Sequence, residues 1–313
     1  MYRPGLFPRL DSGFNGRMTT GSHSYDVVVI GSSNLDLVAN VERLPGPGET
    51  VLGSSYAEHA GGKGLNQAVA AARAGADTAF ITCLGRDHAG DTLHSLMLAE
   101  GIAAYTTDVD GPTGRALISV DASAENSIVV VPGANAHLGI GIVDAHRDVI
   151  SRARVVLCQL EIPVSGVEAA FAIAKAGGAT TILNPAPAAE LTRSLLQLCD
   201  VITPNQHELA LLGGTSALLA AGVSTVLVTL GARGMRIVSN SGEIDVPPFA
   251  VRAIDTTGAG DAACGALATA LSHGLDIGLA ARRAAAAGAL AATKHGAVPS
   301  LPSKADIDSF AGQ

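Results

Sequence analysis

Residues 255–261 read Asp255-Thr256-Thr257-Gly258-Ala259-Gly260-Asp261, and an alanine-rich run with helical character follows to about Leu271. The small residues at 258–260 allow a ligand to approach the backbone closely. The start of the following helix would direct unpaired N–H groups at an anion such as a phosphate. Asp261 in the first turn would repel that phosphate unless it serves as a base, the pairing that a phosphoryl-transfer site needs. A glycine-rich turn with Asp255 or Thr257 as N-cap explains the stretch equally well.

Short apolar runs alternate with helical stretches on both sides of this motif. The first run is Asp26–Gly31, and Met235–Val238 with Ile244–Val246 predicts a β-hairpin later in the chain. A helix is expected over residues 188–198. Strands that alternate with helices predict an α/β fold, a mostly parallel sheet with helices on both faces. The other expected strands are Thr78–Leu84, Val155–Leu160, Thr180–Leu183, Val201–Thr203 and Thr225–Leu230.

Two segments depart from this alternation. Residues 102–131 carry the β segments Ala116–Asp121 and Ser127–Val131, with polar turns and no helix among them. A β-only insert in a βα pattern predicts a small separate sheet. Residues 35–56 read as irregular, with a Pro/Gly turn at 44–48 and weak strand signals on either side.

Composition and charge exclude several classes of function. The 313 residues are 48% hydrophobic, enough for a large core. They carry 28 acidic against 20 basic side chains, a net charge of −8, with no Trp and 3% aromatic residues. This balance argues against a nucleic-acid surface. No apolar run reaches membrane-spanning length, so no membrane partner is expected.

The N-terminal segment and the cysteines bear on location. Residues 1–24 lack the apolar core of a signal peptide. They are expected to be a disordered extension, with Met18 as an alternative start and residues 25–313 as the folded domain. The four scattered cysteines show no metal-binding spacing and fit a reducing cytoplasm.

Several common nucleotide-binding and hydrolase motifs are missing. Gly62-Lys63 is followed by Gly64 where a Walker A motif needs Ser or Thr. No G-x-G-x-x-G opens a helix after the first strand, and H-E-x-x-H and G-x-S-x-G do not occur. These absences exclude several common enzyme classes.

Polar side chains follow several of the predicted strands, namely Asn34, Glu161, Asn184 and Asn205. Ligands of parallel sheets bind at these carboxyl ends. Asn34 and Asp36 alternate, so both can point into one cleft, although an Asx turn explains them as well. Glu161 can equally cap a helix.

Three further motifs each have a structural and a functional interpretation. Gly61-Gly62-Lys63-Gly64-Leu65-Asn66-Gln67 is either a flexible helix start or a contact for a polyhydroxy ligand. Asn205 and Glu208 either form a capping box or face Mg²⁺ and phosphate oxygens. Thr229-Leu-Gly-Ala-Arg-Gly234 is either a plain hairpin entry or a turn that approaches a nucleotide.

The order and spacing of these motifs resemble the ribokinase family of carbohydrate kinases. The match runs from Asp26 to Pro302, and its most specific parts are the motifs at 61–67 and 255–261. The resemblance implies a ribokinase-like α/β fold with a small β-sheet lid formed by segments of about 35–58 and 102–131. Supporting motifs are Asn34-x-Asp36, Gln159-Leu-Glu161, Asn184-Pro-Ala-Pro and Thr203-Pro-Asn205-x-x-Glu208.

The resemblance also implies a reaction, transfer of the ATP γ-phosphate to the 5-hydroxyl of D-ribose. It makes Asp261 the base, and the amides of Gly258, Ala259 and Gly260 the hole for the transferred phosphoryl group. The residues implied for the sugar are Asn34, Asp36, Gly62, Lys63, Asn66, Glu161, Asp255 and Asp261. Those implied for Mg²⁺, phosphates and nucleotide are Asn205, Glu208, Thr229, Gly231, Gly234 and Gly260.

An activating monovalent cation such as K⁺ is a further implication of the resemblance. Many of its ligands would be backbone carbonyls beside the anion hole. The lid is also expected to form the contact of a homodimer. The positions implied for the cation are Asp255, Thr257, Ala291, Lys294, Gly296 and Ser300.

Two features depart from the family pattern. The chain between Leu212 and Thr225 is shorter than usual, with a helix reduced to about Ser216–Ala221. Ala284 stands near the expected adenine site, where the family often carries Asn or His. Both features bear on nucleotide affinity rather than on the chemistry.

Other functions stay open at this point. The same fold could act on deoxyribose, fructose or a nucleoside such as adenosine, or could serve as a sugar-binding regulator without catalysis. A nucleoside needs an aromatic or apolar wall, and the lid has few aromatic residues, Tyr105 among them. A regulator has no use for the carboxylate of Asp261.

Overall fold

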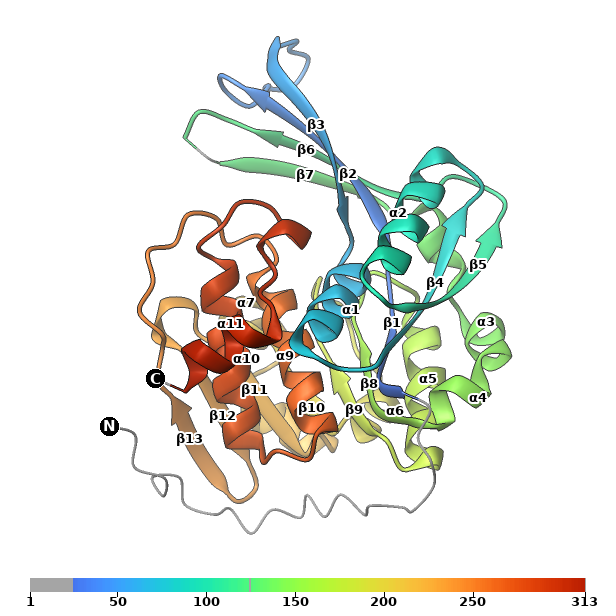
Figure 1. The fold of residues 1–313 in the computed structure, drawn as a ribbon, viewed down its shortest axis with the longest axis vertical. Coiled ribbons are helices and arrows are strands. Elements are labelled where there is room, and N and C mark those ends of the chain that lie inside the picture. The colour runs from blue at the N-terminus through green and yellow to red at the C-terminus, as the bar shows by residue number, and fades with distance from the viewer. Residues whose placement is uncertain (1–24, 124, 313) are drawn as a thin grey trace.

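A nine-stranded sheet forms the centre of the protein (Figure 1). The computed structural model describes residues 25–123 and 125–312. In this sheet the neighbouring strands β11, β10, β9, β8, β1, β4 and β5 run parallel to one another. The hairpin of β12 and β13 extends the sheet antiparallel at the β11 edge, as predicted. In sheet order the strands are β13 (Gly242–Val246), β12 (Met235–Ser239), β11 (Thr225–Thr229), β10 (Val201–Ile202), β9 (Thr180–Leu183), β8 (Ala153–Cys158), β1 (Tyr25–Ile30), β4 (Thr78–Gly85) and β5 (Ala103–Val109).

Helices cover both faces of this sheet, and each face has its own apolar core. Strand β1 shows why: Val27 and Val29 pack into one core while Val28 and Ile30 pack into the other, since successive side chains point to opposite faces. On one face lie α1 (Lys63–Ala74), α2 (His88–Ala99), α9 (Ala259–Ser272), α10 (Ile277–Ala291) and α11 (Lys304–Ala311). On the other lie η1 (Gly133–His137), α3 (Ile140–Ala145), α4 (Arg147–Ser151), α5 (Val164–Gly177), α6 (Arg193–Gln197), α7 (Gln206–Leu211) and α8 (Thr215–Ala221).

Helices α1 and α9 approach each other unusually closely because their facing residues are small. A Cβ on Gly265 of α9 would lie 2.5 Å from the Cβ of Ala70 and 2.7 Å from the backbone nitrogen of Ala71 on α1. A larger residue at 265 would therefore force the two helices apart. The close approach brings the N-termini of α1 and α9, which carry the two most specific sequence motifs, to the same edge of the sheet.

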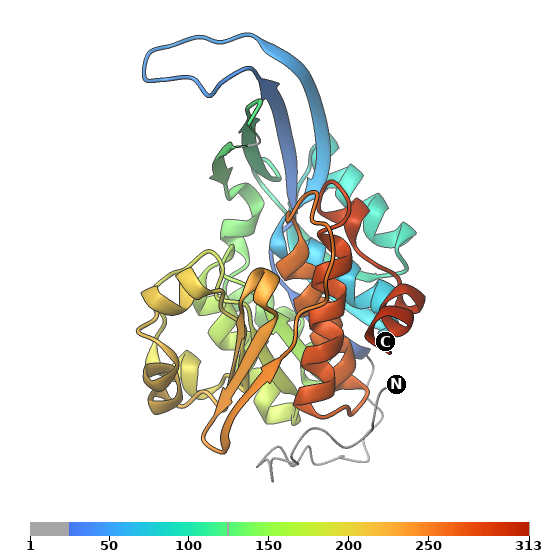
Figure 2. The same ribbon diagram turned by 90° about the vertical axis from the view of Figure 1, so that its left-hand side faces the viewer.

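A second sheet of four strands projects from the main body (Figures 1 and 2). It leaves the body at Asn34, which pairs with Gly61 on one side and Gly114 on the other. The side chains of residues 128–131 are all between 43% and 57% exposed, so its outer strand presents an apolar surface to solvent. Its order is β3 (Gly53–Gly61), β2 (Asn34–Val41), β6 (Gly114–Val120) and β7 (Asn126–Val131).

Three expectations about local structure need correction. The predicted separate sheet does not take in all of 102–131, because β5 pairs with β4 at the edge of the main sheet. Residues 35–56 are irregular only over 42–52, around the Pro/Gly turn, since the weak strand signals on either side correspond to β2 and β3, long strands that gain their partners from each other and from β6. The helix expected over 188–198 shortens to α6, which begins after Thr192 because that side chain caps it by accepting from Leu195 N–H.

Two other expectations concern the ends of the chain and membranes. The predicted extension at 1–24 lies outside the described residues. Within 25–123 and 125–312, no helix has both the length and the apolar character needed to cross a membrane.

Candidate active site

The carboxylate of Asp261 lies in the first turn of α9 and is held by the first turns of α1. Asn66 donates its side-chain N–H to Asp261 Oδ2 at 2.9 Å, and Gln67 donates to Asp261 Oδ1 at 2.9 Å. Asp261 is 7% exposed. The two motifs, almost 200 residues apart, therefore meet around one carboxylate.

Glu161 joins the same site from the end of β8. Its Oε2 accepts the backbone N–H of Lys63 at 3.0 Å and the hydroxyl of Ser32 at 2.6 Å. Gly62 lets the start of α1 reach this position, because its φ is 91° and a Cβ there would lie 2.8 Å from the backbone nitrogen of Asn34. The glycine-rich helix start is thus packed against two strand ends rather than being a flexible turn.

Asp36 and Asn34 enter the site from the base of β2. The carboxylate of Asp36 lies directly over Gly61, where a Cβ would be 2.1 Å from Asp36 Oδ2. Asn34 Oδ1 accepts from the side-chain N–H of Asn135 at 2.8 Å. Burial, followed by the charges of Glu161 and Asp261, raises the pKa of Asp36 to about 7.

Lys63 supplies positive charge to this group of carboxylates. Burial lowers the pKa of Lys63, but attraction by Asp261, Glu161 and Glu208 outweighs burial, so the net shift is upward. Lys63 therefore stays charged at neutral pH. These side chains combine acceptors that suit sugar hydroxyls with the positive charge of Lys63.

One buried acceptor in this pocket has no partner. Asn66 Oδ1 is buried without a hydrogen bond, although Asn66 Nδ2 is bound to Asp261. A buried polar atom left unpaired costs about 1–3 kcal/mol. A ligand hydroxyl that donates to this oxygen would remove that cost.

The turn before α9 is built from residues 256–260. Gly258 is the N-cap with φ 75°, and a Cβ there would lie 3.0 Å from the Cα of Ala297. The N–H of Ala259 donates to the carbonyl of Thr256 at 3.1 Å. Gly260 has no atom within 4 Å of its Cβ position, so its backbone is open to the neighbouring cavity.

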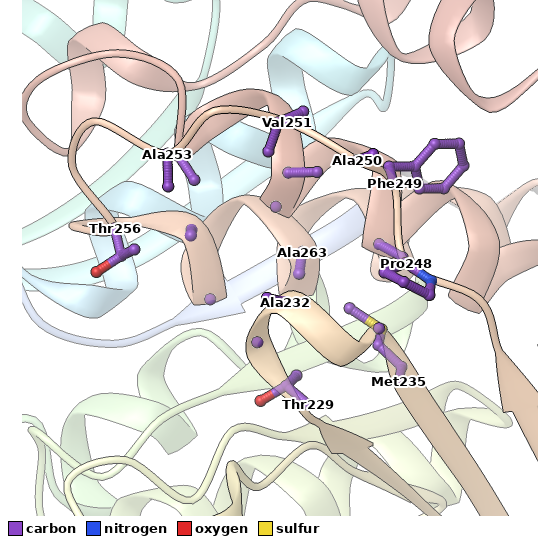
Figure 3. Close-up of a pocket in the computed structure, with 18 residues that line it drawn as sticks. Thr229, Ala232, Met235, Pro248, Phe249, Ala250, Val251, Ala253, Thr256 and Ala263 are labelled. Carbon is purple, nitrogen blue, oxygen red and sulfur yellow. The ribbon is translucent and has the colours of Figure 1, made fainter.

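A cavity of about 370 Å³ opens beside this turn (Figure 3). It brings together Thr229, Gly231, Gly234 and Gly260, all predicted for the nucleotide. Its other walls are mainly apolar and include Met235, Pro248, Phe249 and Val251, a lining that suits a planar base.

The features expected to disturb nucleotide binding do not contact this cavity. Ala284 is wholly buried in the core and is not among the residues that line the cavity, although its neighbour Ala285 is. The face of α10 that lines the cavity carries Ala285, Gly288 and Ala289 instead. The short 213–225 segment forms α8 and contributes no lining residue.

Asn205 and Glu208 form a reciprocal capping box at the start of α7. Glu208 N–H donates to Asn205 Oδ1 at 2.8 Å, and Asn205 N–H donates to Glu208 Oε2 at 2.8 Å. Within the described residues no group of three or more His, Cys, Asp and Glu side chains is placed to hold a metal. Mg²⁺ is commonly held by one or two carboxylates together with substrate phosphates, so the half-buried carboxylate of Glu208 fits that mode.

The positions expected to hold a monovalent cation lie in two neighbouring segments, one before α9 and one from the end of α10 to the short 3-10 helix η3 (Val298–Ser300). Asp255 joins them, since its carboxylate accepts N–H groups of Thr257 at 2.9 Å and Gly296 at 2.8 Å. Burial would raise the pKa of Asp255, but these hydrogen bonds outweigh it and lower the pKa. Ser300 is fully buried and donates to the carbonyl of Ala297 at 2.7 Å. The carboxylate, hydroxyl and carbonyl oxygens suit a hard cation; the remaining positions are Ala291 and Lys294.

Sequence reasoning assigned no role to several residues that support the site. Ser32, Gln67, Gln159 and Asn135 are all 0–1% exposed and hydrogen-bonded to a predicted site residue or to Gln67. Gln67 lies inside the 61–67 motif and Gln159 inside Gln159-Leu-Glu161, so the sequence pattern already drew attention to both positions. Their partners depend on contacts between distant segments.

Comparison with known proteins agrees with this geometry. Residues 24–304 match the model of the pfkB family carbohydrate kinases. The chain belongs to this family. A ribokinase of Haemophilus influenzae is 43% identical over 298 residues, 91% of this chain and 97% of that protein.

Two further relatives place the kinase within the family. A bifunctional ribokinase/ribose-5-phosphate isomerase A of Fructilactobacillus sanfranciscensis is 44% identical over 90% of this chain, which spans 55% of that protein. The structure of Arabidopsis thaliana ribokinase complexed with ribose and ATP has a TM-score of 0.84 and 32% identity, and covers 92% of this chain and 98% of its own. The kinase therefore has a ribokinase-like fold.

Proposed function

We propose that this kinase phosphorylates D-ribose at its 5-hydroxyl with ATP, giving ribose 5-phosphate and ADP. The observation that carries the proposal is the convergence of Asp261, Asp36 and Glu161 on one pocket beside the apolar cavity. The 35–44% identity to ribokinases of several organisms supports ribose as the acceptor.

The residues divide the work of the reaction between them. Asp36, Asn66 and Glu161 would pair with the sugar hydroxyls, together with Asn34, Gly62, Lys63 and Asp255. Asp261 takes the proton of the 5-hydroxyl as its oxygen attacks the γ-phosphorus, and the bond to ADP breaks on the opposite side. The N-terminus of α9, with Gly258, Ala259 and Gly260, would stabilise the charge on the transferred group.

The nucleotide and its ions would lie on the other side of this helix start. The base would fill the cavity lined by Thr229, Gly231 and Gly234. Mg²⁺, when bound, neutralises phosphate charge, and Asn205 and Glu208 would orient it. A K⁺ ion at the Asp255–Gly296 junction would hold the turn before α9 in place.

The small sheet is proposed as the lid and as a homodimer contact. Its base carries Asp36, so a movement of the sheet would move a residue that is proposed to contact the sugar. The exposed residues Ile128, Val129, Val130 and Val131 give an apolar surface of the kind that protein interfaces bury. The acidic chain with its four reduced cysteines is proposed to work in the cytoplasm.

An ADP-release assay over a panel of sugars tests the proposal. The panel contains D-ribose, deoxyribose, fructose and adenosine, each with and without K⁺. We expect the highest kcat/KM with ribose, and K⁺ to increase it. Higher kcat/KM with another acceptor would reassign the substrate, and no ADP with any acceptor would favour a sugar-binding regulator.

A further inference from the structure

A chain of buried side-chain amides leads from the interior to the carboxylate of Asp261. Gln159 donates to Gln67 Oε1 at 2.6 Å, and Gln67 donates to Asp261 Oδ1 at 2.9 Å and to Asn184 Oδ1 at 3.0 Å. Gln67 and Gln159 are fully buried, and Asn184 is 8% exposed. We call Gln159, Gln67 and Asn184 the amide chain.

The direction of every hydrogen bond in the amide chain is determined by its ends. Asn184 donates to the carbonyl of Thr203 at 3.2 Å, so its oxygen faces Gln67 as an acceptor. An ionised carboxylate at Asp261 can also only accept. Both acceptors require the NH₂ group of Gln67, so the side-chain oxygen of Gln67 must face Gln159.

This arrangement leaves one acceptor unpaired at the end of the amide chain that is farthest from Asp261. Gln159 Oε1 is buried and has no hydrogen-bond partner, and it lies so close to Gly31 that a Cβ there would be 2.0 Å away. Rotating the Gln67 amide by half a turn would let its NH₂ group face Gln159, but its oxygen would then face the carboxylate of Asp261. The unpaired oxygen of Gln159 therefore shows that the network is oriented toward Asp261.

We propose that Gln67, held by Asn184 and Gln159, is a positioning residue that fixes the side chain of Asp261. Asn66 holds the other carboxylate oxygen from one side of the pocket, so the two amides leave the carboxylate a single orientation. The role rests on the proposed function of Asp261 as the base. Gln67 itself has no part in the transfer of the proton.

The other titratable groups around Asp261 come from three elements and one loop. They are Asp36 on β2, Lys63 on α1, Cys264 on α9 and Glu161 in the loop after β8, while Glu208 of α7 acts on Lys63 and Cys264. A substitution of Gln67 keeps all of these groups. A change in pH dependence between the variant and the wild type then reports the lost N–H donor.

The test compares Gln67→Met with Thr269→Val in the full-length kinase. Methionine fills the space of Gln67 without an N–H donor. Thr269 is a matched control because its buried hydroxyl also lies between α9 and α1. It is within hydrogen-bonding distance of the carbonyls of Ala71 on α1 (3.2 Å) and Gly265 on α9 (3.0 Å), and it makes no contact with the carboxylate of Asp261. Steady-state kcat and KM are measured from pH 5 to 9, with thermal melts of each variant.

We expect Gln67→Met to lower kcat about 10- to 100-fold, since a misplaced catalytic group costs about that much. The KM for the sugar should change by less than about threefold, because the lost bond is made to the base and not to the sugar. The pH dependence of kcat should differ from that of the wild type, since the carboxylate loses one of its two amide donors. Thr269→Val should leave kcat and the pH profile unchanged.

Two outcomes would overturn the proposal. One is a Gln67→Met variant with wild-type kcat and pH profile; the other is an equal loss of kcat in Thr269→Val. If Gln67→Met gives no cooperative melt, Gln159→Met replaces it, and an unchanged kcat there counts equally against the proposal. Wild-type turnover on another sugar would refute only ribose as substrate, whereas a wild type without turnover on any sugar would overturn both proposals.

Discussion

Glu161, which follows β8, accepts a hydrogen bond at 3.0 Å from the backbone N–H of Lys63, which lies 98 positions earlier at the start of α1. The carboxylate occupies a helix N-terminus, where negative charge is favourable. Ser32 donates to the same oxygen and accepts from the N–H of Gly64 at 3.2 Å. Two strand ends therefore hold the glycine-rich start of α1 in the shape of the pocket.

Replacing Ser32 with Ala should disturb this arrangement. The N–H of Gly64 would lose its acceptor and Glu161 would lose a donor, which should lower the free energy of unfolding by about 1–3 kcal/mol. The KM for the sugar should rise several-fold as Glu161 moves. Urea denaturation and steady-state kinetics measure the two effects.

The neighbouring Ser33 provides the control. It is equally buried, but its hydroxyl pairs with Thr82 Oγ1 at 3.1 Å. Ser33→Ala should therefore destabilise the protein without changing the KM. A similar rise in KM in both variants would contradict the role given to Ser32.

Asp36 should make the stability of the unliganded protein depend on pH. Its pKa rises from 3.8 to about 7 on folding, chiefly through burial. The folded state therefore binds the proton more tightly, and this contribution to stability is full below pH 3.8 and is lost as pH rises to about 7. The slope is at most about 1.4 kcal/mol per pH unit.

The Asp36→Asn variant isolates this contribution, because its side chain does not titrate. The difference in free energy of unfolding between wild type and variant, measured in urea between pH 4 and 8, should fall as pH rises and level off above about 7. A difference that stays constant over this range would show that Asp36 has an ordinary pKa.

Asp261→Asn should remove catalysis and keep the sugar site. The amide has the shape of the carboxylate but cannot take the proton, so kcat should fall by about 10²–10⁴. The dissociation constant for ribose, measured by calorimetry, should change little. Near-wild-type turnover would exclude Asp261 as the base.

Asp276→Asn is a matched control for this substitution. Asp276 also stands at a helix start, where it caps α10 by accepting from Leu279 N–H at 2.9 Å. It should keep full kcat.

A large side chain at Ala289 should compete with the nucleotide. Ala289 lines the apolar cavity from α10, so a phenylalanine there would fill part of its 370 Å³. The KM for ATP should rise at least about tenfold, since one lost contact of 1.4 kcal/mol already gives that factor. The KM for the sugar should stay the same, and parallel titrations of ATP and sugar would measure both.

Leu279 on the same helix serves as the control. It is 37% exposed and does not line the cavity. Leu279→Phe should leave both KM values unchanged. If Ala289→Phe binds ATP normally, the nucleotide base lies elsewhere.

Much of the fold was predictable because it depends on local patterns. The alternation of apolar runs and helical stretches predicts the parallel sheet with helices on both faces, and the structure confirms it. The same patterns gave only weak signals for β2 and β3, and they did not place β5 in the main sheet. Strand pairing there is decided by distant partners, and a single window of sequence does not contain them.

The residues of the site, like the elements of the fold, divide into those that the sequence predicts and those that it does not. Residue type and position at strand ends and helix starts indicate Asp36, Glu161 and Asp261, because such positions collect at one edge of a parallel sheet. The amide chain through Gln67 could not be predicted, since the bonds of Gln67 join segments 92 to 194 residues apart. The orientation of α10, which turns Ala284 into the core and Ala285 toward the cavity, likewise depends on tertiary packing.

The sequence by itself determined the fold class, the family resemblance and the chemical identity of the groups at the strand ends. Only the tertiary structure decided which of these groups meet and in what state. Asp36 has a raised pKa because folding buries it near Glu161 and Asp261. Asp261 has one orientation because Asn66 and Gln67 are brought to it by the close packing of α1 against α9. Distances and burial arise only when distant segments pack together, so no local pattern encodes them.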